Sequence, residues 1–218
     1  MGSNTILHIA TSLPGFLFAI VFHEAAHAWM ATRFGDDTAK SMGRLSLNPL
    51  VHYDPIGTVL FPMIGAMLGG VMFGWARPVP VDSRRFKNVR SGIFWVSFAG
   101  PGANILLSIL SAFLLAVVIN FVPQNFEFFE VLYLMLHQSM LINVILAVFN
   151  LIPFPPLDGS KMVSSMLDYE AARKYEDLQR FSFVFILILW FTPLFTYLVQ
   201  PAMLFSRGLL RLFMQILG

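Results

Sequence analysis

His23-Glu24-Ala25-Ala26-His27 places two imidazoles and a carboxylate between apolar residues on both sides. Residues four apart share one face of a helix, so His23 and His27 can offer two neutral nitrogens to one metal ion. Glu24 then lies close enough to act on a water molecule held by that metal. The apolar flanks indicate that this motif lies in a membrane.

A second interpretation makes both histidines ordinary helix-interface residues, with Glu24 paired to one of them. A charged carboxylate at membrane depth is costly unless it has a partner. The residues near Glu24 in the sequence offer none besides the two histidines. We therefore favour metal binding.

The composition indicates a membrane as the solvent of this chain. Hydrophobic residues make up 57% of its 218 residues and charged residues only 12%, with a mean hydropathy of +0.72. These values are typical of multi-pass membrane proteins. The net charge of +2 is too small and dispersed to suggest a nucleic-acid partner. Without cysteine, a metal must be held by His, Asp or Glu. We identify no cleavable signal peptide.

Four apolar runs are long enough to cross about 30 Å of hydrocarbon, namely residues 6–34, 92–122, 131–152 and 181–199. A fifth run, residues 55–75, is rich in glycine and contains Pro62, which makes it poor helix material. The last run, residues 202–217, carries Arg207 and Arg211 four residues apart and suggests an interfacial amphipathic helix. We expect an all-α multi-pass membrane protein, a helical bundle of four to six membrane segments.

Charge predicts the orientation. Lys and Arg gather in residues 33–44, 77–90 and 161–180, whereas residues 122–130 contain two Glu and no basic residue. The positive-inside rule therefore makes the three basic segments cytoplasmic and the acidic loop external. The run 55–75 must then enter and leave on the same side, as a re-entrant hairpin packed within protein. A true fifth span is the alternative that the sequence leaves open.

A catalytic zinc takes three protein ligands, so two histidines are not enough. The acidic residues that border apolar runs are Asp36, Asp37, Asp54 and Asp158. Only Asp158 lies in a rigid, proline-rich turn, and the hairpin topology places it on the same side as the histidines. With a full fifth span it would lie at the opposite face, about 30 Å away. A plain turn carboxylate beside Gly159 is the other interpretation.

Three motifs occur in order: the 23–27 motif, Phe98-Ala99-Gly100-Pro101-Gly102-Ala103-Asn104, and the 150–159 segment ending in Leu157-Asp158-Gly159. With them, residues 14–161 resemble the site-2 protease family of zinc-dependent intramembrane metalloproteases. The resemblance implies that His23, His27 and Asp158 bind one zinc per chain and that Glu24 is the general base. It also implies a transmembrane protein substrate, cut within or near the bilayer.

The Asn48 to Thr58 segment looks like that of the compact prokaryotic members of this family. We expect a single membrane domain over residues 1–218, with a catalytic core at 14–161 and C-terminal membrane segments at 181–218. No segment has the length or polarity of an appended PDZ or CBS domain. The expected location is a prokaryotic cell membrane, with the active site towards the cytoplasmic side.

Several further residues are candidates for substrate contact. Arg77-Pro78-Val79-Pro80-Val81 is expected to be extended, and Val79 and Val81 either pair with an unwound substrate strand or belong to a plain connector. Asn104 and Asn150 either donate to an oxyanion or hold helices together, and packing is favoured for Asn104. His52 is a candidate extra ligand, proton shuttle or gate, or has no role.

Two other functions use the same residues. A metal permease or sensor would bind the metal without hydrolysis, but it needs ligands that reach both faces, and the candidate ligands gather near one. A pseudoprotease that only binds helices would be expected to lack Glu24, which is present. The sequence leaves the physiological substrate and the oligomeric state open.

Overall fold

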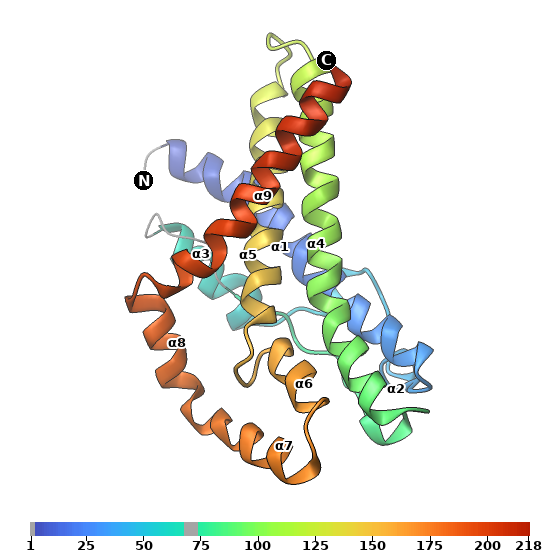
Figure 1. The fold of residues 1–218 in the computed structure, drawn as a ribbon. Helices are drawn as coiled ribbons and strands as arrows, with labels where there is room; N and C mark the ends of the chain where they lie inside the picture. The colour runs from blue at the N-terminus through green and yellow to red at the C-terminus, as the bar shows by residue number, and fades with distance from the viewer. Residues whose placement is uncertain (1–2, 68–73) are drawn as a thin grey trace.

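The computed structural model describes residues 3–67 and 74–218, and these form helices and loops without a strand (Figure 1). Among these described residues, three helices are long and apolar enough to cross a membrane, and a bent pair gives up to four such spans. The three are α1 (Ser3–Arg33), α4 (Val89–Phe121) and α5 (Phe129–Leu151). This confirms the predicted all-α, multi-pass membrane fold.

Shorter elements connect these helices and follow them. Between α1 and α4 lie α2 (Thr38–Ser41), η1 (Pro49–Val51), η2 (Pro55–Leu60), α3 (Phe61–Met67) and η3 (Ser83–Arg85). After α5 come α6 (Asp158–Ser164), α7 (Tyr169–Glu176), η4 (Asp177–Phe181), α8 (Ser182–Phe191) and α9 (Leu194–Leu217).

The helices α1, α4 and α5 pack closely because small residues lie where they meet. Lipid is as apolar as a leucine side chain, so close backbone approach and interhelical hydrogen bonds hold membrane helices together. A Cβ at Gly15 of α1 would lie 3.1 Å from Ser139 Cα of α5. Between α4 and α5, the hydroxyls of Ser111 and Ser139 lie 3.0 Å apart. These contacts fix the frame that carries the site.

The two ends of the run 55–75 lie side by side. The Trp75 N–H donates to Gly57 O at 3.0 Å, and Thr58 Oγ1 donates to Trp75 O at 3.1 Å. Within the described part of the run, η2 and α3 are each too short to cross a bilayer. Contact between the two ends is what a re-entrant hairpin requires. Residues 68–73, which include the tip of the expected hairpin, lie outside the described residues.

The predicted span over residues 181–199 is wrong as a single helix. The chain bends by 74° between α8 and α9, at Thr192 and Pro193. Proline has no N–H to continue the helix and disfavours helical geometry in the residue before it, and Thr192 is extended. With ten residues at about 1.5 Å each, α8 crosses only about half of the hydrocarbon.

The predicted interfacial helix over residues 202–217 is also corrected. It is the second part of α9, which lies lengthwise against α4 (Figure 1). The contacts follow both helices in the same direction, from Ser108 with Ser206 to Phe113 with Phe213 and then Asn120 with Met214. The amphipathic pattern that suggested a membrane surface belongs to a helix with one face on α4 and its arginines exposed.

The loops at the C-terminal end of α1 are tied to that helix. The Asp36 carboxylate accepts hydrogen bonds from the N–H groups of Thr38 and Asp82, and the Lys87 N–H donates to Phe34 O. Burial alone would raise the pKa of Asp36, but these hydrogen bonds, together with the Thr38 hydroxyl and the nearby Arg85, lower it overall. Residues 82–87 therefore lie at the same end of the bundle as the residues that follow α1.

This arrangement predicts the labelling of single cysteines placed in the cysteine-free chain. Cysteines at Lys40 and Lys87 should react with a membrane-impermeant thiol reagent from the same side, and one at Gln124, beyond the far end of α4, from the opposite side. The positive-inside rule makes the first side cytoplasmic. The measurement is labelling in intact cells compared with inverted vesicles. Labelling of Lys40 and Lys87 from opposite sides would exclude the hairpin.

Candidate metal centre

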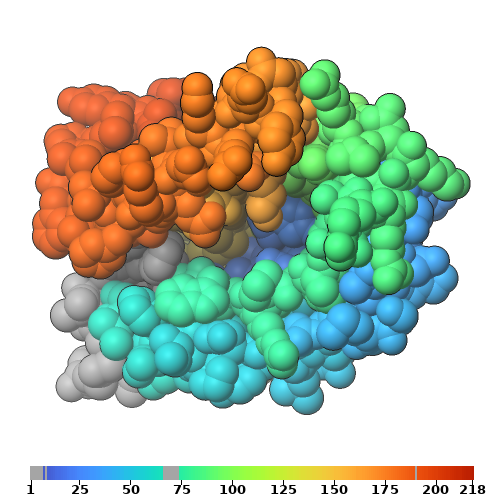
Figure 2. All heavy atoms as spheres, turned by 90° about the horizontal axis from the view of Figure 1, so that it is seen from below, coloured from blue at the N-terminus to red at the C-terminus, as the bar shows by residue number. Residues whose placement is uncertain are grey.

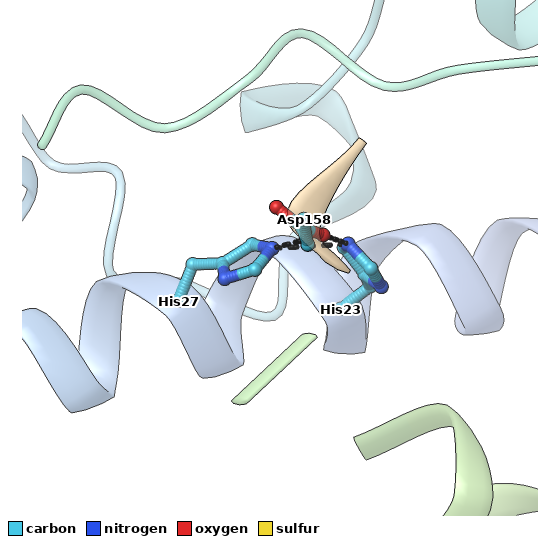
Figure 3. Close-up of side chains that lie close together, drawn as sticks. All are labelled: His23, His27 and Asp158. Atoms are coloured by element: carbon cyan, nitrogen blue, oxygen red, sulfur yellow. Dashed lines mark hydrogen bonds and ion pairs between the residues drawn. The ribbon is translucent and has the colours of Figure 1, made fainter. Parts of the chain in front are cut away.

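Three side chains from two distant parts of the sequence converge below the surface (Figure 3). His23 and His27 come from α1, and Asp158 is the first residue of α6. The two Nε2 atoms lie 3.0 Å apart, and Asp158 Oδ2 lies 3.1 Å from His23 Nε2 and 3.2 Å from His27 Nε2. Each residue is less than 10% exposed. The structure thus brings together the three ligands expected from the sequence.

Asp158 reaches the histidines because α6 starts directly against the end of α5. Glycine at position 159 permits this contact. A Cβ there would lie 2.7 Å from Ile152 O, which is too close for any residue with a side chain. The Ser160 hydroxyl donates to Leu157 O and helps to fix the turn before the helix. Asp158 Oδ1 also forms an ion pair with Lys161 at 3.6 Å.

The hydrogen bonds behind the histidines decide which nitrogens face one another. His27 Nδ1 lies 2.6 Å from Val96 O, and His23 Nδ1 lies 2.7 Å from Asn104 Oδ1. Both oxygens are acceptors, so in neutral rings Nδ1 carries the hydrogen and Nε2 is a lone pair. Two lone pairs and a carboxylate oxygen then face one another at about hydrogen-bond distance without a donor. A metal ion between the three atoms, or a proton on one of the Nε2 atoms, reconciles the three acceptors in this geometry.

The dimensions fit a metal ion. A tetrahedral zinc with bonds of about 2.0 to 2.1 Å has ligand-to-ligand edges of about 3.3 Å, and the three edges here are 3.0, 3.1 and 3.2 Å. Gly100 of α4 leaves the space beside the ligands open, since a Cβ there would lie 2.6 Å from His23 Nε2. Three ligands leave one position of a tetrahedron for water, as catalytic zinc sites do.

Glu24 lies beside this centre and contacts the extended segment. Its Oε2 accepts a hydrogen bond of 2.8 Å from the Val79 N–H. Residues 74–82 are neither helix nor strand, as expected for an unpaired extended segment. The carboxylate next to the metal centre is thereby joined to the backbone of residues 77–82.

A cavity of about 750 Å³ opens beside the ligands. His23, Glu24 and Asn150 contribute polar groups to it, and most of its wall is apolar and comes from α3, α5, α8 and α9. Figure 2 shows one face of the molecule hollowed, with α1 at the bottom of the hollow between the orange residues after α5 and the cyan to green residues after α1. An apolar wall with polar groups at one place suits an apolar substrate that reacts at a single polar group.

The remaining candidates lie in different places. Asn150 lines the cavity and donates to Leu146 O on its own helix. His52 is 1% exposed, its Nε2 lies 2.8 Å from Ser46 O, and its Nδ1 has no partner among the described residues. His52 is not part of the cavity wall, whereas its carbonyl accepts from the Arg77 N–H. Val81 is 41% exposed.

Asn104 lies between the helices and not on the cavity wall. It is fully buried and donates to Ala19 O and to Asn143 Oδ1. This supports the helix-packing role. The sequence analysis missed the contact of Asn104 with His23 and the position of Gly100 against both histidines. Both residues lie in the 98–104 motif, which the sequence did indicate as part of the catalytic core. A sequence motif does not, however, show that these two residues contact the histidines.

Comparison with known proteins gives relatives of one kind. The model of Peptidase family M50 matches residues 125–190. YwhC of Bacillus subtilis, named as a zinc metalloprotease, is 37% identical over 199 residues, which are 90% of this chain and 88% of YwhC. Rip2 proteins of Mycolicibacterium smegmatis and Mycobacterium tuberculosis, named in the same way, are 31% identical over 83% of this chain and 66% of their own length. No solved structure matches significantly.

A methyl group at Gly100 should displace the metal. In Gly100→Ala the Cβ would lie 2.6 Å from His23 Nε2, whereas helix propensity favours alanine by about 1 kcal/mol. We expect a helical protein that purifies without zinc, as measured by elemental analysis. The control is Gly102→Ala on the same helix, whose nearest neighbour is the movable ring of Phe98 at 3.3 Å. Equal zinc in both variants would contradict the proposed position of the metal.

Proposed function

The chain belongs to Peptidase family M50, the site-2 protease family of zinc metalloproteases, and from this we propose that it cuts a transmembrane helix of a membrane protein within or near the bilayer. One observation carries the proposal. Three metal-binding acceptors and a carboxylate lie at the edge of a large apolar cavity, inside a bundle of membrane-spanning helices. A protease that acts on water-soluble chains has no need of such walls.

The proposed roles follow from position. His23, His27 and Asp158 hold one zinc ion, which when bound acts as a Lewis acid that activates water and polarises the scissile carbonyl. Glu24 takes a proton from the attacking water and passes it to the leaving amide nitrogen. Glu24 is suited to this because it lies beside the centre without belonging to the group of three ligands.

The cavity supports an apolar substrate. Its wall combines Ile142, Ile145 and Leu146 of α5 with Leu189 of α8 and Phe195 of α9. An apolar helix can lie against such a wall, but its carbonyls are engaged in its own hydrogen bonds. The substrate must therefore unwind near Glu24 before a carbonyl can react.

The segment 77–82 is placed to receive the unwound strand. It is held at three points: the Arg77 N–H donates to His52 O, the Val79 N–H to Glu24 and the Asp82 N–H to Asp36. Pro78 and Pro80 have no N–H, so between those points the backbone offers its carbonyl acceptors and a single N–H, that of Val81. We propose that substrate N–H groups pair with these carbonyl acceptors by strand addition. Residues 77–82, including Val81, would then form the backbone track on which the substrate strand lies. The plain-connector interpretation does not account for the bond to Glu24.

The proposed location is the cell membrane of a prokaryote, with the centre towards the cytoplasmic side. The relatives named above are bacterial. Basic residues gather in the loops at the end of the bundle where α1 finishes, which the positive-inside rule makes cytoplasmic. The partners are the lipid bilayer and a transmembrane protein substrate.

The ligand set predicts about one zinc per chain in the purified protein. Asp158→Ala should lose the metal, because two histidines alone do not complete a catalytic zinc site. Elemental analysis and a competing chelator measure the loss. Lys161→Ala is the control, since it removes the ion-pair partner of Asp158 and leaves the ligand in place. Full zinc retention in Asp158→Ala would exclude Asp158 as the third ligand.

Glu24→Gln should keep zinc and the fold but lose cleavage. The amide retains the shape and hydrogen-bonding ability of the side chain but cannot take a proton, and loss of an acid–base group typically slows a reaction by about 10² to 10⁴. Wild type and variant are incubated in liposomes with single-span substrates, and the fragments are identified by mass spectrometry. Equal cleavage rates would show that Glu24 is not the base. If neither protein cuts while both move zinc across the bilayer, a permease replaces the protease.

A further inference from the structure

A chain of buried amides leads away from the metal centre. Asn104 of α4 and Asn143 of α5 are both fully buried, and neither is part of the cavity wall. Asn104 Nδ2 donates to Asn143 Oδ1 at 2.9 Å and to Ala19 O at 3.1 Å, and Asn104 Oδ1 lies 2.7 Å from His23 Nδ1. Asn104 thus forms hydrogen bonds with α1 at two points one helical turn apart.

The direction of every hydrogen bond in this chain is set by two backbone carbonyls. Asn143 Nδ2 lies 2.8 Å from Ser139 O, which only accepts, so the amide nitrogen of Asn143 must point there. Asn143 Oδ1 then faces Asn104 and takes a hydrogen from its Nδ2. The second hydrogen of that Nδ2 goes to Ala19 O.

This leaves only an acceptor, Asn104 Oδ1, for His23. His23 must therefore carry its hydrogen on Nδ1 and present Nε2 as a lone pair towards Asp158 and His27. A flipped Asn104 would place its NH₂ against His23 Nδ1 and its oxygen against the two acceptors, which loses both donations in a buried place. Leaving buried polar groups unsatisfied in this way costs several kcal/mol.

We propose that Asn104, fixed by Asn143, is a positioning residue that sets the tautomer and ring orientation of His23, so that zinc affinity depends on two amides that touch neither metal nor substrate. The inference rests on the ligand role of His23 in the proposed function. Without Asn104 Oδ1, nothing holds the hydrogen on Nδ1, and the tautomer with hydrogen on Nε2 cannot bind a metal through the nitrogen that faces the centre. Partners of this kind typically contribute 10- to 100-fold in metal affinity.

The test is zinc binding by the full-length protein in detergent, measured by competition with a chelating dye after the resident metal is removed. Asn104→Ala should bind Zn²⁺ about 10- to 100-fold more weakly than wild type. Asn143→Ala should also bind zinc more weakly than wild type, because Asn104 loses the hydrogen bond that fixes the orientation of its amide. Asn104→Asp keeps an oxygen for Nδ1 but loses the amide donor to Ala19 O and Asn143 Oδ1, so its affinity should lie between those of Asn104→Ala and wild type. The visible spectrum of Co²⁺-loaded protein should change in the same order, since it reports the ligand geometry.

Ser108→Ala is the matched control. Ser108 is buried on α4 one turn after Asn104 and donates to Met140 O on α5, so it contributes an equivalent helix contact without touching a ligand. It should bind zinc as wild type does. The proposal is overturned if Asn104→Ala folds and keeps wild-type affinity, or if Ser108→Ala loses as much affinity as Asn104→Ala.

If Asn104→Ala does not give monodisperse protein, Asn143→Ala decides. Weaker zinc binding by Asn143→Ala than by Ser108→Ala supports the proposal, and equal binding by these two variants overturns it. The outcome is separate from the protease function. A wild type that binds zinc through His23 but cuts no substrate would contradict the proposed function and leave the role of Asn104 intact.

Discussion

Three acceptor atoms face one another at about 3 Å in a place that water scarcely reaches. This arrangement is repulsive unless a metal ion or a proton lies between the atoms, and the surrounding structure holds them in this geometry. The α1 helix presents two of the acceptors four residues apart, and the start of α6 brings the third. The close packing of α1, α4 and α5 and the tight join between α5 and α6 all serve this one geometry.

The rest of the molecule surrounds that centre with an apolar cavity on one side and an extended backbone segment on the other. Helices α8 and α9 complete the apolar wall of the cavity, and the bend at Thr192 and Pro193 lets one stretch of chain line the cavity and then turn to run along α4. On the other side, residues 77–82 lie beside Glu24, tied to the loops at the end of α1. An apolar surface and a polar backbone track thus meet at the metal.

The sequence predicted the helical membrane fold, and the three side chains that it named as metal ligands lie together in the structure. It did so because the 23–27 motif sets its own geometry on a helix, and because charge placed Asp158 on the same side. It failed for the C-terminal runs, since hydropathy measures only whether a stretch is apolar. Pro193 signalled the break, but the helix that follows was recognised only by its contacts with α4. The contact of Asn104 with His23 was also missed, because a polar residue in an apolar helix does not reveal which neighbour it meets.

The hydrogen bond from Val79 to Glu24 joins the base to the backbone of the segment that we propose as the substrate track. Because this hydrogen bond fixes the track relative to Glu24, it also fixes which residue of a bound strand lies beside Glu24. On the proposed function, the bond that is cut is set by how many residues separate it from the point where the substrate helix unwinds. Selectivity then depends on where that helix unwinds most readily, and the side chains around the cut bond act mainly by making unwinding easier or harder.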